Sequence, residues 1–130
     1  MPPAARQNDT VTATDIHIIL VPSPSGSVPT PTPMPFAGLL QQGLSTDVMI
    51  NGLPAATVDS IAVNTPAHVP TGGPFQKPPS NQGKVIMGSL TVLINGKGAA
   101  RVGDTVMTCN DPADAPIGSI SAGSPNVVVG

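Results

Sequence analysis

The sequence predicts a small all-β domain built from short hairpins, and three observations lead to that prediction. Its 130 residues fit a single domain, and 39% of them are hydrophobic while only 9% are charged. The apolar residues, mostly Val, Ile, Leu and Ala, stand in short runs between turn residues, and Pro (17) and Gly (14) are abundant. A similar unit also recurs along the chain. The low net charge of −2 with this apolar content argues against a disordered Pro-rich scaffold, which a cooperative thermal transition would exclude.

Two segments share a pattern made of a strand, Asn-Gly, a Pro/Gly-Ala-Ala triplet and an Asp. Val48 to Asp59 reads VMINGLPAATVD, and Val92 to Asp104 reads VLINGKGAARVGD. Asn-Gly between short apolar runs favours a tight β-hairpin, because both turn positions take positive φ. We therefore expect one hairpin in each segment.

The two ends of the chain supply a third, divided copy of this unit. Residues 3–9 (PAARQND) repeat its second half, and residues 123–130 (GSPNVVVG) match the lead-in at residues 88–96 (GSLTVLING). The last strand can therefore pair with the first and complete a third hairpin. This predicts one closed, pseudo-threefold domain over residues 1–130 with its termini side by side. Closure would also remove exposed strand edges.

Each copy is followed by one residue that could bind a metal. The two His and the single Cys of the chain follow the Asp of the three copies by eight, nine and five residues: His17 after Asp9, His68 after Asp59 and Cys109 after Asp104. A threefold arrangement would bring these side chains together on its axis. Imidazole and thiolate suit Zn²⁺, with iron as the alternative. One Cys cannot form an internal disulfide, so a metal is the staple open to this loop-rich domain.

Three protein ligands leave a fourth coordination position open. Water, Asp111, Asp114 and Thr30 are candidates for it, and three ligands plus water is also the arrangement of a catalytic zinc. A zinc hydrolase is therefore an alternative. No His-Glu-x-x-His motif or other general base accompanies the His residues, however. We predict that the protein is not an enzyme and has no catalytic residues.

Other features exclude further classes or describe the loops. No run of charge suggests binding to nucleic acid or to an anionic membrane surface. The apolar run Ile16 to Val21 is too short to span a bilayer, and the N-terminal MPPAAR lacks the layout of a signal peptide. The Pro-rich segment Pro22 to Pro35 is interpreted as a stiff loop that wraps the domain, with a polyproline ligand as the alternative. Residues 71–80 are interpreted as a second such loop.

The triplets of the repeats point to a known family. PAAR at Pro3 to Arg6, PAAT at Pro54 to Thr57 and GAAR at Gly98 to Arg101 resemble the signature of PAAR-repeat proteins, and the resemblance covers most of the chain. It implies a small β-cone that caps a trimeric VgrG-like spike, as a monomer on a trimer, in type VI secretion and related phage-tail-like contractile injection systems. A zinc near the apex of the family's cone is typically held by three His and one Cys.

Carried over to this sequence, the resemblance implies that His17, His68 and Cys109 bind zinc, and Thr30 stands where the family has its third His. It also implies a mechanical function, in which the metal-stabilised tip helps to pierce the target membrane during a transient contact. An adaptor that docks separate effector cargo onto the spike is the alternative. The protein would assemble in the cytoplasm and leave the cell with the injection particle, not by the general secretory route.

Overall fold

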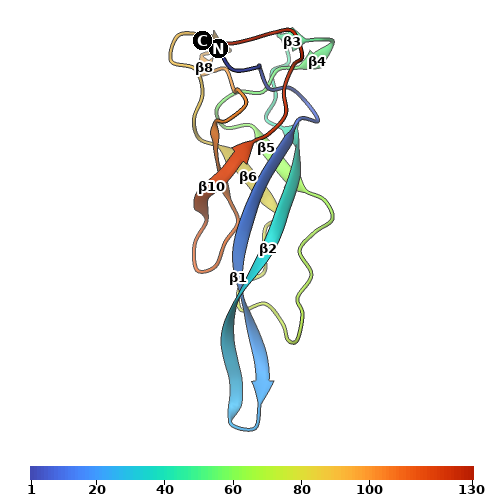
Figure 1. Ribbon diagram of the computed structural model, residues 1–130, viewed down its shortest axis with the longest axis vertical. Coiled ribbons are helices and arrows are strands. Elements are labelled where there is room, and N and C mark those ends of the chain that lie inside the picture. Colours follow the sequence, from blue (N-terminus) through green and yellow to red (C-terminus); the bar gives the residue numbers. More distant parts are fainter.

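The computed structural model describes residues 1–130 and shows an all-β protein, which confirms the predicted fold class. One end is broad and carries both termini and two short hairpins, and the other end narrows to a long two-stranded ribbon (Figure 1). The chain forms no helix that is long and apolar enough to cross a membrane. The strands are β1 (Thr10–Ser23), β2 (Gly26–Gln42), β3 (Met49–Ile50), β4 (Leu53–Pro54), β5 (Ile61–Asn64), β6 (Gln82–Val85), β7 (Leu93–Ile94), β8 (Lys97–Gly98), β9 (Thr105–Thr108) and β10 (Ala115–Ile120).

Six of the strands close into a barrel in the order β1-β10-β9-β6-β5-β2. The barrel consists of three antiparallel hairpins, β1–β2, β5–β6 and β9–β10. Equivalent backbone bonds fix the three hairpins, because the N–H groups of Leu40, Val85 and Ile120 donate to the carbonyls of Asp9, Ser60 and Asp104 respectively. Buried apolar side chains fill the interior, among them Val11, Phe36, Leu40, Ala62, Val85, Val106 and Ile120. The barrel therefore repeats one hairpin unit three times around a central core.

Three Ala-Ala pairs meet at the centre of the broad end. The Ala5 N–H donates to the Ala100 carbonyl (2.9 Å), Ala100 donates to Ala56 (3.0 Å), and Ala56 donates to Ala5 (3.0 Å), which closes a ring of three main-chain bonds. All three residues are at most 1% exposed. Only small side chains fit where three chain segments approach one axis. This crowding explains the Ala of the repeat and confirms the pseudo-threefold arrangement.

Two short hairpins flank this centre at the broad end. The turns of β3–β4 and β7–β8 are Asn-Gly, with φ values of 53° and 79° at Asn51 and Gly52 and of 54° and 79° at Asn95 and Gly96. Positive φ at both turn positions is what the sequence predicts for these hairpins.

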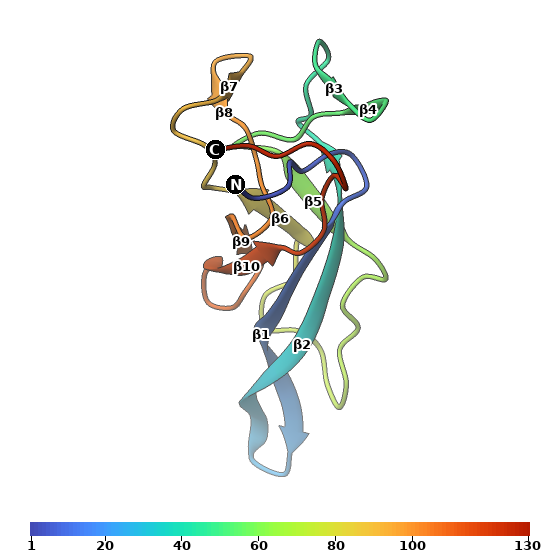
Figure 2. The same cartoon turned by 45° about the horizontal axis from the view of Figure 1, so that its top comes forward.

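The two chain ends lie side by side at the broad end, next to the β7–β8 hairpin (Figure 2). Pro3 forms a β-bridge with Val128, and the Ala4 N–H donates to the Val127 carbonyl at 2.9 Å. In the second and third repeats, Ala55 and Ala99 make the equivalent bonds. The paired ends thus occupy the place of the hairpin that the first repeat lacks.

The structural repeat differs from the sequence alignment at one position. The equivalent of Asp9 in the second repeat is Ser60 and not Asp59. The Ser60 hydroxyl accepts the Thr57 N–H at 2.9 Å, just as the Asp9 carboxylate accepts the Arg6 N–H at 2.7 Å. Asp59 is the turn residue before it, with a φ of 77°. Hydroxyl and carboxylate oxygens can both accept this local bond, so the chemistry of the position is kept while the residue type changes.

The Pro-rich segment Pro22 to Pro35 does not form the wrapping loop that the sequence suggested. It belongs to the β1–β2 hairpin, whose strands pair continuously from Thr10 opposite Leu39 to Ser23 opposite Gly26. Only alternate N–H groups of a strand face its partner, so prolines at every second position leave the ladder intact. Residues 71–80 do form a segment without strand structure, and it lies against the outer edge of β1.

Candidate metal centre

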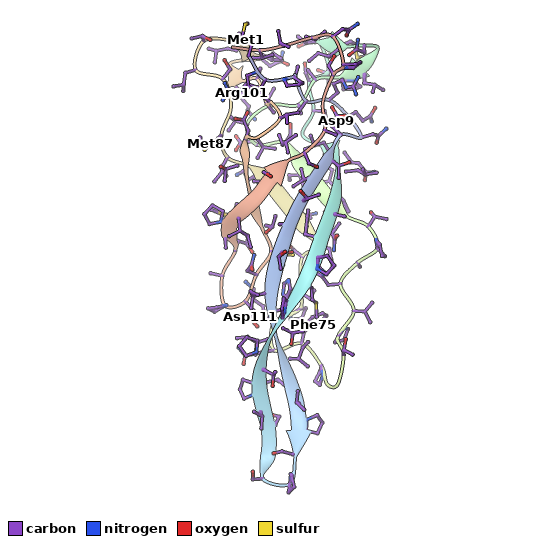
Figure 3. The ribbon with its side chains drawn as sticks, viewed as in Figure 1. Met1, Asp9, Phe75, Met87, Arg101 and Asp111 are labelled. Atoms are coloured by element: carbon purple, nitrogen blue, oxygen red, sulfur yellow. The ribbon has the colours of Figure 1, made fainter.

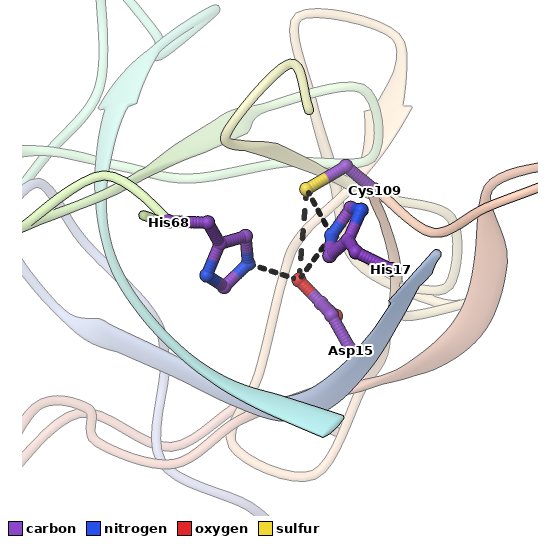
Figure 4. Close-up of side chains that lie close together, drawn as sticks. All are labelled: Asp15, His17, His68 and Cys109. Carbon is purple, nitrogen blue, oxygen red and sulfur yellow. Dashed lines mark hydrogen bonds and ion pairs between the residues drawn. The ribbon is translucent and has the colours of Figure 1, made fainter. Parts of the chain in front are cut away.

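All three barrel hairpins contribute to one cluster of metal-binding side chains. Asp15 and His17 lie on β1, His68 follows β5, and Cys109 follows β9. Their ligand atoms all lie within 4.8 Å of one another, and the four side chains converge from different directions (Figure 4). The structure therefore brings the three residues singled out from the sequence together. Counted from Ser60, His68 follows after eight residues, which equals the spacing from Asp9 to His17.

The distances within the cluster are close to those of a tetrahedral site. Asp15 Oδ2 lies 2.9 Å from His68 Nε2, 3.5 Å from Cys109 Sγ and 4.0 Å from His17 Nε2. Cys109 Sγ lies 3.7 Å from His17 Nε2. With zinc–ligand bonds of about 2.0–2.3 Å, tetrahedral geometry places neighbouring ligand atoms about 3.3–3.7 Å apart. The carboxylate, two imidazoles and thiol therefore fit a metal ion.

Burial sets the protonation of the cluster. Asp15, His17 and Cys109 are 0%, 1% and 3% exposed. Burial lowers the pKa of His17, and the charge of the neighbouring His68 lowers it further. Burial raises the pKa of the Cys109 thiol, with the Asp15 carboxylate acting in the same direction. His17 is thus held in the neutral form that binds metal, whereas a metal must displace the proton of Cys109.

Polar neighbours hold two of these side chains in place. Asp15 Oδ1 accepts a hydrogen bond from the Thr108 hydroxyl at 2.5 Å. His68 Nδ1 lies 3.3 Å from the Asn64 side-chain nitrogen, and the backbone N–H of His68 donates to Asn81 Oδ1 at 2.8 Å. Groups of this kind orient the ligands of metal sites and commonly tune metal affinity.

Asp15 is the member of the cluster that the sequence reasoning missed. The three candidates for the fourth position do not join the cluster: Asp111 is buried but stands outside the group, Asp114 is exposed, and Thr30 lies exposed on the ribbon. The sequence did hold a signal for Asp15. It stands two residues before His17, so on a strand both side chains point to the same face.

The cluster does not lie at the extreme point of the molecule. The β1–β2 ribbon continues past His17 to its turn at Pro24 and Ser25. The Phe75 ring packs edge-on against the His17 ring with centroids 5.7 Å apart, and Phe75 and Asp111 mark the level where the ribbon leaves the body (Figure 3). A metal here would fasten the root of the ribbon, whereas the resemblance implied a zinc near the apex.

One comparison with known proteins gives a family. The family model described as PAAR motif matches residues 76–130, which include the Gly98-Ala99-Ala100 triplet, Cys109 and the C-terminal strand. A search of curated proteins found no match. The matched region contains the complete third repeat and the C-terminal half of the divided repeat, residues 123–130. This agrees with the resemblance seen in the triplets, and the match over residues 76–130 supports a PAAR-repeat protein.

Proposed function

We propose that this protein is the metal-stabilised tip of the spike of a contractile injection system. It would sit on the end of a trimeric VgrG-like protein and help to breach the target membrane, as a structural part and not as an enzyme. The PAAR motif supports this role. The observation that carries it is the buried Asp15–His17–His68–Cys109 cluster, which ties all three hairpins to one point.

A structural zinc fits this cluster better than a catalytic one. Structural zinc sites have four protein ligands, whereas catalytic sites keep one position open for water or substrate. With Asp15 the chain offers four donors, and the carboxylate and thiolate together balance the charge of Zn²⁺. This weighs against a zinc hydrolase. A metal would join β1 to the segments after β5 and β9 more firmly than hydrogen bonds alone do.

The broad end offers a surface that suits a threefold partner. Met49, Leu93 and Val128 occupy equivalent positions in the three repeats and are 59%, 63% and 52% exposed. Exposed apolar side chains grouped on one face commonly mark an interaction site. Each subunit of a trimer presents the same surface once, so a trimer can contact all three of these apolar side chains in the same way. We therefore place the spike contact at this end, opposite the ribbon. The protein would assemble onto the spike in the cytoplasm and then leave the cell with the injection particle.

A second candidate function, docking of separate cargo, is favoured by one asymmetric feature. A hollow of about 550 Å³ beside the third repeat is lined by Met87, Leu90 and Arg101, among others. Leu90 is 96% exposed, and the equivalent positions hold Thr46 and Pro125. A trimer presents three identical contacts, so a feature found in one repeat suits a single-copy partner. Effector that co-purifies with the chain without the spike would support this role, and its absence would weigh against it.

Metal content tests the proposed function directly. Elemental mass spectrometry of purified protein should find about one zinc per chain, because the four donors form one site. The variants Asp15→Ala, His17→Ala, His68→Ala and Cys109→Ala should each lose most of it. Asp114→Ala and Thr30→Ala are matched controls from the earlier candidates, and they should keep wild-type metal.

Two outcomes would change the proposal. Wild-type protein without metal would remove the metal-stabilised tip. Zinc retained in Asp15→Ala but lost from the other three variants would show that water and not Asp15 takes the fourth position, and the hydrolase alternative would regain its open site.

A further inference from the structure

The outer part of the β1–β2 ribbon stands apart from the body of the protein. The last backbone bond between β1 and the body is donated by Leu20 to the Pro74 carbonyl at 2.9 Å. Residues 21–31 make no hydrogen bond outside the ribbon itself. At about 3.4 Å per strand residue, the seven positions from His17 to Pro24 extend roughly 24 Å beyond the metal cluster.

Prolines occupy nearly every outward-facing position on the two edges of this ribbon. The bonds that Ile18 and Leu20 make with residues 74–76 show that even-numbered residues of β1 face away from β2. Their register partners on β2 are odd-numbered, and they face away from β1. The prolines at these outward strand positions are Pro22, Pro29, Pro31, Pro33 and Pro35. Because proline has no N–H, Ser27 retains the single outward N–H among strand residues 21–35.

The side chains of the ribbon are equally poor in groups that need water. No Asp, Glu, Lys or Arg occurs between Asp15 and Asp47. Three of the ribbon's hydroxyl groups are bound locally: Ser23 donates to the Gly26 carbonyl, Thr30 to Val28 and Thr32 to Thr30. The ribbon thus carries few donors and no charge that would have to be stripped of water.

These properties favour lipid as the partner of the ribbon. In the hydrocarbon region of a bilayer each unpaired N–H or C=O costs several kcal/mol and a charge is also costly, so an ordinary strand edge is excluded. The prolines remove most of the outward N–H groups while the outward carbonyls remain. The cost is therefore lowered and not abolished, which suits a transient entry. A protein partner that added a strand to either edge would need the N–H groups that the prolines remove. We propose that the β1–β2 ribbon is the part of this chain that enters the hydrocarbon region of the target membrane. From Leu20, where its last bond to the body lies, the ribbon reaches about 14 Å to Pro24, close to the depth of one leaflet of a core about 30 Å thick. This inference rests on the proposed function.

Fluorescence can test the inference, because the chain contains no Trp or Tyr. Val28→Trp places a single reporter near the ribbon turn, where Val28 is 50% exposed, and Leu93→Trp places one at the broad end. Each variant is mixed with phosphatidylcholine vesicles that carry doxyl quenchers on their acyl chains. We expect a blue shift and strong quenching for Val28→Trp and little of either for Leu93→Trp. Adding Ser25→Lys and Ser27→Lys to Val28→Trp should abolish both signals.

Equal quenching at both ends, quenching at the broad end alone, or no quenching at the ribbon would each overturn the inference. The second result would assign lipid contact to the apolar side chains of the base instead. Metal content of the same samples separates this test from the proposed function. Protein that binds zinc but shows no quenching at Val28→Trp would lose the inference and keep the metal-stabilised tip. Protein that binds no zinc but shows quenching at Val28→Trp would keep the inference and lose the metal-stabilised tip.

Discussion

At the scale of single residues, Asp15 and His17 decide the chemistry of the site. They lie two apart on β1, so the pleat places both side chains on the inner face. A fully buried carboxylate is costly unless it is paired, and Asp15 is paired with the Thr108 hydroxyl and with His68. These contacts hold the Asp15 carboxylate in position, and a bound metal would replace the contact between Asp15 and His68.

The lowered pKa of His17 gives a stability prediction for the metal-free protein. The unfolded chain binds a proton at His17 near pH 6.5, while the folded chain binds it only at lower pH. Stability should therefore be lost as pH falls below about 6.5 and approaches the folded pKa, because the unfolded state binds more protons in that window. Thermal unfolding of metal-free protein between pH 7.5 and 5, in steps of about half a unit, checks this. His17→Gln should flatten the dependence, and an unchanged slope in that variant would contradict the assignment to His17.

At the scale of elements, the turn signals and the repeats gave correct predictions, whereas features that depend on strand register were missed. The Asn-Gly turns of β3–β4 and β7–β8 depend on two adjacent residues, so the sequence was sufficient. The ribbon was missed because proline is read as a strand breaker, whereas its effect depends on which edge each position faces, and only the register reveals that. Asp15 was missed because it shares a face with His17 only if both lie on one strand, and no strand was predicted over these residues.

Three buried glycines show how closely the barrel elements are packed. Gly38, Gly83 and Gly118 precede the equivalent residues Leu40, Val85 and Ile120 by two positions. A Cβ at Gly83 would lie 2.9 Å from Val106 Cγ1. Gly83→Ala should therefore lower the free energy of unfolding by about 1–3 kcal/mol. Urea denaturation measures this, with Ala113→Ser as an exposed control expected to stay within about 0.5 kcal/mol. Wild-type stability in Gly83→Ala would show that the barrel interior can expand.

At the scale of the whole molecule, symmetry is high at one end and absent at the other. The ring of Ala5, Ala56 and Ala100 and the three apolar positions around it repeat at the base. Beyond the metal cluster the loop after β5 runs beside the ribbon for a short distance, and only the β1–β2 hairpin continues to the extreme point (Figure 1). The cluster lies at this transition, where the two shorter hairpins end and the third is held by residues 74–76 and by the side chains of the cluster.

This division predicts that the two ends can be disabled separately. Leu93→Lys places a charge among the exposed apolar side chains of the base, where docking on a trimeric VgrG-like spike would bury it without a partner. The affinity should fall by at least about 2 kcal/mol, or roughly 30-fold, if Leu93 anchors the contact. Val28→Lys, at a similarly exposed position on the ribbon, should bind the spike like wild type.

Titration of each purified variant against the spike trimer, followed by size-exclusion chromatography with light scattering, measures affinity and stoichiometry together. One chain should bind per trimer, since a pseudo-threefold base uses all three contacts at once. Three chains per trimer, or equal loss of binding in Leu93→Lys and Val28→Lys, would show that docking does not use the threefold base. A loss confined to Leu93→Lys would place the spike at the broad end, and it would leave the uncharged ribbon pointing away from the particle as the first part to reach the membrane.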